Sequence, residues 1–349
     1  MVRKLLQVAQ KVGVSEATVS RVLNGKSGVS DSTRQAVLTA LDVLGYERPT
    51  QLRGVRARLV GLVLPELQNP IFPALAEVAG GALVQLGFTP VLCTRTAGGL
   101  TEAEYVTMLL DQQVSGVIFC GGLNTEESAS LKERGMPVVL LNAAIDYSGF
   151  PQVSTDDVAA VQQAYAHLTS LGHSRIGLMV GPADHTPSRR KAAAFTALAQ
   201  RTTPTGARAS KDTHPIGHAL FSFEGGQAVA TELLTTGITA LICGSDILAL
   251  GAIRAARRQG LTVPHDLSVV GYDDSAFMNY TDPPLTTLRQ PIEAMSRAAV
   301  TLLANQINGT NPTPKELLHE PELVVRQSTA PTPQSTHLTQ PGLRAIGAN

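Results

Sequence analysis

Two pairs of adjacent aspartates are the residues of this chain that most readily suggest chemistry. Asp156-Asp157 and Asp273-Asp274 each follow a short predicted strand, and paired carboxylates can act as general acid and base in hydrolysis. Adjacent residues on a strand point to opposite faces, so neither pair converges by itself. The sequence also lacks a Gly-x-Ser-x-Gly elbow, a Walker loop and the Cys/His spacing of a metal site. We therefore expect no enzymatic activity, no cofactor and no bound metal.

The distribution of charge indicates a second kind of chemistry. The chain is neutral overall, but residues 1–58 contain ten Lys and Arg against four Asp and Glu, and the remainder carries the opposite surplus. A basic segment on an acidic body fits a protein that meets phosphate at one end only. A solvated charged surface would give the same count, so charge alone leaves both interpretations open.

The basic segment has the apolar spacing of three short helices. Its apolar residues repeat every three or four positions, and serines and glycines stand where helices begin or end. We predict a helix that ends at Gly13, a second over 16–24 that Ser15 caps, and a third over 31–44 that Ser30 caps. This arrangement is the helix-turn-helix plan.

A basic linker without strong periodicity follows, and from residue 60 short apolar strands alternate with helices in two series. The predicted strands are 59–64, 89–93, 117–120, 137–141 and 152–154, then 175–180, 218–221, 240–243 and 268–272. The predicted helices are 73–86, 102–112, 158–171, 188–199, 226–234 and 247–259. Such alternation is typical of doubly wound parallel sheets, whose ligand sites lie at the carboxyl ends of strands. Two series predict two similar lobes with a cleft between them.

The composition is that of a globular protein. The chain has 349 residues, enough for two or three domains, with 43% hydrophobic and 16% charged residues. No apolar run reaches the roughly 18 residues of a membrane span, and the basic N-terminus is not followed by the apolar stretch of a signal peptide. We expect a cytoplasmic protein. The cysteines Cys93, Cys120 and Cys243 lie in apolar runs and are interpreted as buried small residues.

A series of short motifs runs through the chain. In the basic segment they are Val8-Ala9, Val12-Gly13-Val14-Ser15, Thr18-Val19-Ser20-Arg21-Val22-Leu23-Asn24, Val29-Ser30, Thr33-Arg34 and Leu44-Gly45-Tyr46. In the core they are Asn69-Pro70-x-Phe72, Leu171-Gly172-His173, Gly244-Ser245-Asp246, Val270-Gly271-Tyr272-Asp273-Asp274 and Pro283-Pro284-Leu285-Thr286-Thr287. In these motifs the chain resembles, over residues 3–329, the LacI/GalR family of bacterial transcription regulators. Residues 45–50, 65–73 and 274–279 are similar to the maltose- and maltodextrin-utilisation repressors of that family.

The resemblance implies an α/β fold, with an N-terminal helix-turn-helix head followed by a two-lobed periplasmic-binding-protein-like core of parallel sheets. The implied domains are a DNA-binding head (1–46), a hinge (47–59), a core for effector binding and dimerisation (60–328), and a Pro/Thr/Gln-rich disordered tail (329–349). Lobe 1 is expected over about 60–158 and 291–319, and lobe 2 over about 159–290 and 320–328. The chain would cross between the lobes near 158–162, 288–292 and 318–323.

The implied function is sequence-specific repression of carbohydrate-utilisation genes, controlled by a small sugar-like effector. We expect a homodimer, because one head offers too few contacts for useful specificity. Its two heads would read half-sites about one helical turn apart.

The resemblance places the second helix in the major groove of operator DNA. The residues that it would present are Ser15, Glu16, Ala17, Thr18, Ser20 and Arg21, with Asn24 at its end. Arg21 suits a bidentate contact to guanine or a phosphate contact, and short hydroxyls suit phosphates and base edges. Alternative roles remain open for Glu16, as a helix-start carboxylate, and for Asn24, as a helix-end cap.

The hinge departs from the family's usual pattern. Many members insert a leucine from a hinge helix into the minor groove, and here Leu52 is the candidate wedge. The segment between Tyr46 and Gly61 is about three residues shorter than usual, and Gly54 shortens any hinge helix. A linker leucine that covers the core is the alternative for Leu52.

The resemblance also transfers an effector site onto the core. Its positions are Asn69, Phe72, Asn142, Asp156, Phe221, Asp246 and Asp273, with a basic residue among Arg189, Arg190 and Lys191. The basic residue is left open because the family's arginine stands three residues before a Gly-aromatic pair, where this chain has Lys191 and Ala194. Amides, carboxylates and aromatic faces suit a polyhydroxyl ligand, so we expect a sugar. Roles in turns, caps or the core are the alternatives for these residues.

Two other function classes share parts of these patterns. A sugar-binding protein without a DNA role has the same core but needs no DNA-binding head, and a transport protein of that kind needs a signal peptide. A hydrolase would use the paired carboxylates. The basic head and the divergence of each aspartate pair favour the regulator over both.

Overall fold

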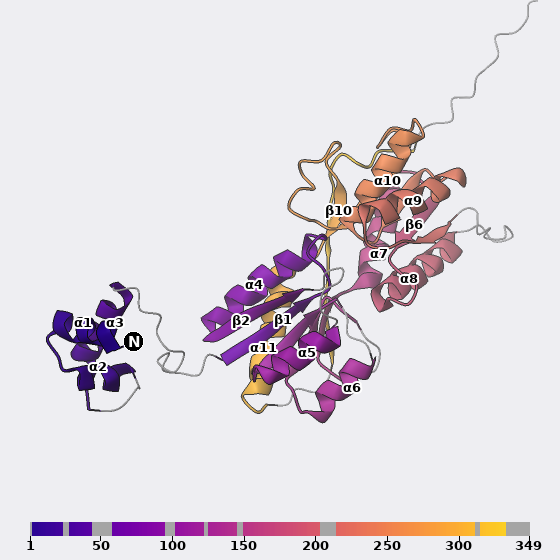
Figure 1. The fold of residues 1–349 in the computed structure, drawn as a ribbon. Helices are drawn as coiled ribbons and strands as arrows, with labels where there is room; N and C mark the ends of the chain where they lie inside the picture. Colours follow the sequence, from indigo (N-terminus) through magenta and orange to yellow (C-terminus); the bar gives the residue numbers. More distant parts are fainter. Residues whose placement is uncertain are drawn as a thin grey trace, which may run out of the picture. The chain divides into compact units, whose positions relative to one another are not determined.

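The protein is represented by a computed structural model that describes residues 2–23, 28–43, 58–94, 102–121, 125–144, 149–202, 214–310 and 315–332. The chain forms two compact units, a small N-terminal one and a core that takes up nearly all of the rest (Figure 1). No helix in these ranges is long and apolar enough to cross a membrane.

Three helices make up the described part of the N-terminal unit. They are α1 (Val2–Val12), α2 (Glu16–Leu23) and α3 (Asp31–Val43). Their facing sides bury a small apolar core of Val8, Ala9, Val19, Val22, Val37, Ala40 and Leu41. α1 ends where Gly13 adopts a φ of 74°, a left-handed conformation that costs glycine little.

Serines begin the second and third helices, as the sequence predicts. Ser15 Oγ accepts a hydrogen bond from the Thr18 N–H at 3.1 Å, and Ser30 Oγ accepts one from the Thr33 N–H at 3.2 Å. The predicted C-terminal residues of these two helices, Asn24 and Leu44, lie outside the described residues.

Lobe 1 of the core is built on a six-stranded sheet in the order β11-β5-β4-β3-β1-β2. Its strands are β1 (Arg58–Leu64), β2 (Phe88–Thr94), β3 (Gly116–Cys120), β4 (Val138–Leu141), β5 (Gln152–Thr155) and β11 (Glu316–His319). Its helices are α4 (Ile71–Gln85), α5 (Glu102–Asp111), α6 (Thr125–Glu133) and α11 (Ile292–Ile307). The pairs β1–β3, β3–β4, β4–β5 and β5–β11 are parallel.

Lobe 2 repeats this plan with the order β12-β10-β9-β8-β6-β7. Its strands are β6 (Ile176–Val180), β7 (Ile216–His218), β8 (Ala240–Cys243), β9 (Ser268–Asp273), β10 (Thr286–Arg289) and β12 (Glu322–Val324). Its helices are α7 (Asp157–Ser170), α8 (Thr186–Thr202), α9 (Phe223–Thr235) and α10 (Asp246–Arg258). Only β12 runs antiparallel to its neighbour among the pairs described in this sheet. The predicted class, an α/β core of two parallel-dominated sheets after a helical head, is confirmed.

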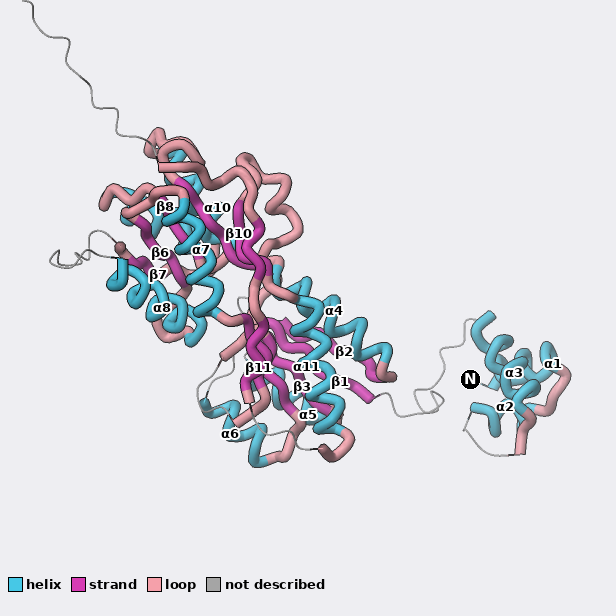
Figure 2. Tube along the Cα trace, turned by 180° about the vertical axis from the view of Figure 1, so that it is seen from behind, coloured by secondary structure: helices cyan, strands magenta, loops and turns pink. Residues whose placement is uncertain are grey.

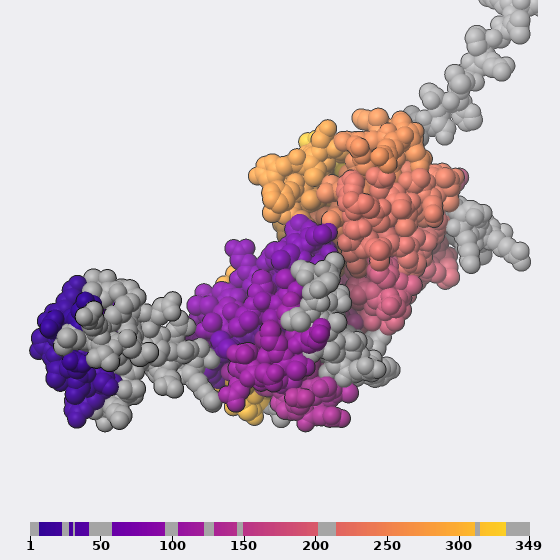
Figure 3. Space-filling view, in the orientation of Figure 1, coloured from indigo at the N-terminus to yellow at the C-terminus, as the bar shows by residue number. Residues whose placement is uncertain are grey.

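The chain passes between the lobes three times. The passages lie between β5 and α7, between β10 and α11, and between β11 and β12. As a result α11, late in the sequence, packs against α4, β3 and β4 of lobe 1 (Figure 2). In the space-filling view lobe 1 is mainly purple and lobe 2 mainly red and orange (Figure 3).

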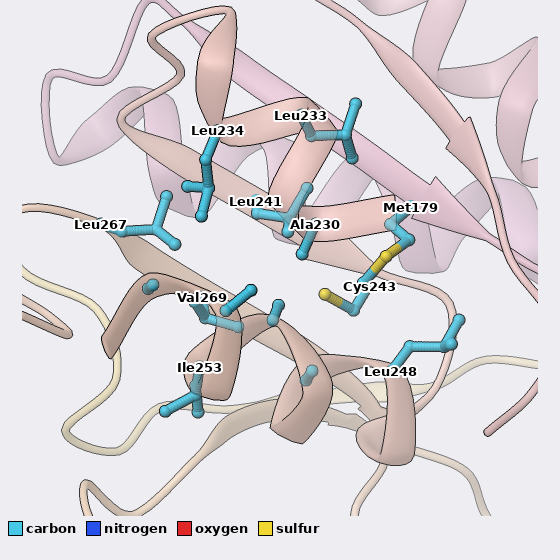
Figure 4. Packing of buried hydrophobic residues seen from close by; sticks show 14 of the residues in the cluster. Met179, Ala230, Leu233, Leu234, Leu241, Cys243, Leu248, Ile253, Leu267 and Val269 are labelled. Atoms are coloured by element: carbon cyan, nitrogen blue, oxygen red, sulfur yellow. The ribbon is translucent and has the colours of Figure 1, made fainter. Parts of the chain in front are cut away.

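Each lobe buries its own apolar core between sheet and helices. In lobe 2, Met179, Leu241 and Cys243 of the sheet face Leu248 and Ile253 of α10, and Leu233 and Leu234 of α9 close the cluster (Figure 4). The three cysteines are buried and free, as predicted. Burial raises the pKa of the Cys120 thiol to about 12, so this thiol stays protonated at neutral pH.

Two expectations about chain segments are corrected. The strand predicted over 218–221 is wrong, because β7 ends at His218 and Ser222 caps α9, so the chain must turn between them. The start of the expected tail belongs to lobe 2. There Thr329 Oγ1 lies 3.0 Å from His167 Nε2, and the Thr332 N–H donates to the Leu171 carbonyl at 2.9 Å. The remainder, 333–349, lies outside the described residues.

Candidate functional site

The outer face of α2 carries the residues that the sequence assigns to DNA contact. Ser15, Glu16, Ala17 and Arg21 are exposed, and Thr18 and Ser20 are half-buried. Val19 and Val22 on the opposite face are fully buried in the head. This division leaves one polar face of a short helix open, which is the arrangement that a recognition helix requires. Asn24 and Leu52 lie outside the described residues.

Ser15 and Thr18 also bond to each other within the head. Their hydroxyl oxygens are 2.9 Å apart, and Ser15 already caps the helix. These contacts hold the start of α2, where Glu16 and Ala17 are exposed, and Arg21 is exposed in the last turn of the same helix.

A cavity of about 620 Å³ lies between the two lobes of the core. Its walls come from the last residues of, or the segments that follow, β1, β3, β4 and β5 of lobe 1 and β6, β7, β8, β9 and β10 of lobe 2. All of these segments stand at the carboxyl ends of strands, where doubly wound sheets place their ligands. The volume is within the range of about 300–1,000 Å³ that is usual for small-molecule sites.

Six of the residues assigned to effector binding line this cavity. They are Asn69, Phe72, Asn142, Lys191, Phe221 and Asp273. They come from five different segments of the sequence, since only Asn69 and Phe72 are near neighbours, so only the tertiary fold brings them together. Asn69 also caps α4, since its Oδ1 accepts a hydrogen bond from the Ile71 N–H at 3.3 Å.

Four other assigned residues do not line the cavity. Asp156 caps α7 and accepts from the N–H groups of Val158 and Ala159 at 3.0 and 2.9 Å. Asp246 is buried behind the wall, where it accepts from the Thr287 hydroxyl at 2.6 Å.

The two arginines among these four face away from the cavity as well. Arg189 is exposed, and its guanidinium donates to Thr186 Oγ1 at 3.1 Å. Arg190 donates two hydrogen bonds to the Glu316 carboxylate, at 2.6 and 2.9 Å. Because Arg190 belongs to α8 and Glu316 to β11, this ion pair joins the two lobes.

Lys191, which stands at the family's arginine position, is held in a buried group. Its Nζ forms an ion pair with Asp157 Oδ1 and lies 4.1 Å from the centroid of the Tyr272 ring. The Tyr272 hydroxyl donates to the same carboxylate oxygen at 3.4 Å. Burial and the Asp157 carboxylate raise the pKa of Tyr272 well above its usual value, so the hydroxyl stays protonated and remains a donor.

Asp273 ends β9 with one oxygen bonded and one oxygen unpartnered. Its Oδ1 accepts from Gln290 Nε2 at 2.6 Å, and Gln290 Oε1 accepts from the Thr155 hydroxyl at 2.6 Å. Its Oδ2 is buried without a hydrogen-bond partner. Its φ of 120° is an unusual conformation for a residue other than glycine, and such strain is often retained at binding sites.

Two buried carboxyl groups, Asp273 in the cavity wall and Asp246 behind it, have raised pKa values. Burial and the nearby Asp246 raise the pKa of Asp273 well above its usual range. Burial raises the pKa of Asp246 to about 6. The environment therefore disfavours a full negative charge on both groups.

Phe221 forms an aromatic wall with His185. The two ring centroids are 5.5 Å apart and the rings meet edge to face at 80°. A Cβ at Gly181 would lie 2.2 Å from Phe221 Cε2, so only glycine leaves room for this ring. Burial and the neighbouring Lys191 lower the pKa of His185 to about 4, so its imidazole is neutral at physiological pH.

The sequence interpretation missed several residues of the cavity wall. They are Thr155, Asp157, His185, Tyr272 and Gln290. A signal existed for Asp157: an aspartate just before a helix is a favoured N-cap, so Asp156 is bonded to backbone while its neighbour is left free to turn inward. No local pattern marks the others.

No cluster of three or more His, Cys, Asp or Glu residues suited to a metal ion occurs in the described part of the chain. What the core offers a ligand is a set of amides, carboxyl groups, hydroxyls and aromatic faces. Such a site can bind and orient a polar organic molecule by hydrogen bonding and ring stacking.

Two family models match the chain. Residues 4–49 match that of the bacterial regulatory proteins of the lacI family, and residues 165–329 match that of a periplasmic binding protein-like domain.

The chain is similar over most of its length to transcription regulators from Streptomyces. It is 50% identical to the HTH-type transcriptional regulator reg1 of Streptomyces lividans over 339 residues, which cover 95% of this chain and 98% of that protein. The same identity and coverage relate it to the HTH-type transcriptional regulator MalR of Streptomyces coelicolor.

Solved structures of two regulators resemble the fold. The complex of the transcriptional regulator CelR with cellobiose is 32% identical, with a TM-score of 0.69, and the match covers 93% of this chain and 99% of that one. The lac repressor dimer bound to operator and the anti-inducer ONPF is 29% identical, with a TM-score of 0.74 and coverage of 93% and 98%.

Proposed function

Because the chain belongs to the lacI family of bacterial regulatory proteins and is a DNA-binding transcription regulator, we propose that a sugar in its interlobe cavity controls its affinity for operator DNA. The DNA-binding head also separates it from sugar-binding proteins without a DNA role. We propose that it represses carbohydrate-utilisation genes.

The cavity between the lobes is the observation that carries this proposal. It is lined by amides such as Asn69 and Asn142, by the carboxyl group of Asp273 and by the ring of Phe221. Amide and carboxyl oxygens accept from sugar hydroxyls, amide N–H groups donate to them, and aromatic rings cover the C–H faces of a pyranose. Of the assigned residues we retain these, together with Phe72 and Lys191, in the proposed site.

The effector acts in this proposal by changing the relation of the two lobes. A ligand that touches both walls binds a closed arrangement more tightly than an open one, and it can shift operator affinity only through that difference. The three passages between the lobes, together with the Arg190–Glu316 ion pair, are the connections that such a change would move.

The head binds DNA through α2 in this proposal, with Arg21 as the principal base or phosphate contact. The protein acts as a homodimer, because two heads double the contacts with a near-palindromic operator. The lac repressor, which is similar in fold, is known as a dimer on its operator. We place the protein in the cytoplasm, where operator DNA is found, and we propose no catalytic activity, since its relatives are transcription regulators.

We propose maltose or a maltodextrin as the effector. The local resemblance to maltose-utilisation repressors and the 50% identity to the regulator MalR both support this choice.

Thermal-shift measurements with a ligand panel test the effector. The panel contains maltose, maltotriose, cellobiose, trehalose and, as a different chemical class, hypoxanthine. A ligand at about 100 times its dissociation constant stabilises the folded protein by about 2.7 kcal/mol, which melting curves detect easily. A sugar that raises the melting temperature should also change the affinity for an operator selected from random DNA. A response to hypoxanthine alone would contradict the proposal.

A further inference from the structure

Six residues with acidic or basic side chains line the cavity, and their arrangement bears on the charge of the ligand. They are Glu66, Asp157, Asp184, His185, Lys191 and Asp273. Four carry carboxyl groups, whereas Lys191 is the one lining residue in the described part of the chain with an ammonium or guanidinium group. An anionic ligand would need a free cation, so the state of Lys191 decides whether the cavity can accept one.

The ammonium group of Lys191 is already neutralised. Its ion pair with Asp157 is almost fully buried, with 8% of the lysine side chain and 5% of the aspartate side chain exposed. The face of the Tyr272 ring, 4.1 Å from Nζ, adds a second favourable contact. The pair as a whole is neutral, and the remaining N–H groups of Nζ can still donate hydrogen bonds to a ligand hydroxyl.

Neither arginine next to Lys191 in the sequence substitutes as a cation for the ligand. Arg190 is bonded through two nitrogens to Glu316, and Arg189 is exposed, with neither residue among those that line the cavity. Moving Arg190 inward would break an ion pair that joins the lobes.

Asp273 and His185 in the cavity wall offer no positive charge to an anion. Burial and Asp246 raise the pKa of Asp273, so a second negative group placed beside it would meet the same penalty. Burial and the neighbouring Lys191 lower the pKa of His185 to about 4, so an imidazolium does not form at neutral pH. Glu66 and the exposed Asp184 are acidic, so neither offers a positive charge to an anionic ligand.

Three helix starts beside the cavity each have one backbone N–H group already occupied by a side chain. Ser222 Oγ accepts from the Gly225 N–H at 3.0 Å, and Ser245 Oγ accepts from the Leu248 N–H at 3.3 Å. In α4 the Asn69 side chain does the same for Ile71. At these helix starts, side chains therefore occupy N–H groups that would otherwise attract a phosphate.

We propose that the effector is an uncharged sugar and that the Asp157–Lys191 ion pair is the determinant that excludes sugar phosphates and sugar acids. The proposal rests on the proposed function, because it takes the interlobe cavity as the effector site. It assigns a specificity role to Asp157, which directly follows Asp156, the residue that the sequence analysis assigned to effector binding.

Calorimetric titration of the full-length protein with matched sugars tests the proposal. The probes are maltose, cellobiose and trehalose, each compared with its 6-phosphate. We expect the neutral member of the pair that binds to do so with an affinity higher by about a hundredfold or more, since the phosphate would be buried without a free cation. Equal or tighter binding of a phosphorylated sugar overturns this inference and leaves the sugar-effector function intact. Binding of neither member of any pair overturns both.

A charge-removing variant locates the determinant. In Asp157→Asn, Lys191 loses its charged partner, so the preference for the neutral sugar should shrink by about tenfold or more. Asp156→Asn is the matched control: it changes the adjacent carboxylate, which caps α7 outside the cavity, and should leave the preference unchanged. An unchanged preference in Asp157→Asn, or an equal loss in both variants, overturns the role of the ion pair. The wild-type comparison needs no variant and stands if Asp157→Asn fails to fold.

Discussion

Replacing Asp273 with asparagine should separate effector binding from folding. The asparagine carbonyl can still accept the hydrogen bond from Gln290 Nε2, which spans 2.6 Å in the wild type. What the change removes is the second carboxyl oxygen, which is buried, unpartnered and part of a residue that lines the cavity. A protonated carboxyl oxygen, which can both donate to and accept from a ligand hydroxyl, becomes an amide nitrogen that can only donate.

The expected loss of affinity follows from the strength of that bond. Because the raised pKa of Asp273 keeps its carboxyl group protonated, the bond joins neutral groups and contributes about 0.5–1.5 kcal/mol, which corresponds to roughly twofold to tenfold weaker effector binding. Operator affinity without effector should stay close to that of the wild type, since the head shares no residue with the cavity. Calorimetry with the effector and fluorescence anisotropy with operator DNA measure the two quantities on one preparation.

The dependence of stability on pH gives an independent check. The pKa of Asp273 is raised in the folded protein, so the folded state holds a proton that the unfolded state loses near pH 4. The free energy of unfolding of the wild type therefore falls as the pH rises above that value. Asp273→Asn lacks this group, so its stability relative to the wild type should increase between pH 4 and pH 8 in thermal melts.

Asp246→Asn is the control for a buried carboxyl group outside the cavity wall. Its side chain accepts from Thr287 and from the Ser275 N–H, so this change should lower the melting temperature and alter effector affinity little. Wild-type effector affinity in Asp273→Asn would refute the assignment of Asp273. A joint loss of melting temperature and operator binding would show a structural role instead.

Three further outcomes are expected. Arg21→Ala should abolish specific operator binding in mobility-shift assays while effector binding is retained, because the side chain is exposed on α2. A specific shift at physiological salt would contradict the assignment of α2 to DNA binding. Gly181→Val should weaken effector binding by about threefold to tenfold, because a Cβ 2.2 Å from Phe221 displaces the ring that covers the ligand. Unchanged affinity in calorimetry would remove Phe221 from the site. His185→Gln should lessen the loss of stability on acidification from about pH 6.5 to pH 4. In the wild type the unfolded chain binds a proton in this range, whereas the folded His185, with a pKa of about 4, does not. Parallel melting profiles for variant and wild type would argue against this.

Local patterns in the sequence determined the elements of this protein. The spacing of Val19 and Val22 predicted the buried side of α2, and the serines before the second and third helices predicted their starts, because a helix repeats every 3.6 residues and needs a cap at its first N–H groups. Strand and helix alternation likewise predicted two parallel sheets with a ligand site at their carboxyl ends. Short segments such as β12 and the start of the tail gave no such pattern, since contacts with distant residues hold them.

Only the tertiary structure decided which polar residues face the cavity. Asp156 and Asp157 differ by one position, yet one caps a helix and the other pairs with Lys191, because the turn at the start of α7 points successive side chains in different directions. The same holds for Arg190 and Lys191 on α8: the first reaches across to lobe 1 and the second turns inward. These directions depend on how helix starts meet sheet ends and on three chain passages between lobes. They are set by packing between residues more than a hundred positions apart, which no local pattern encodes.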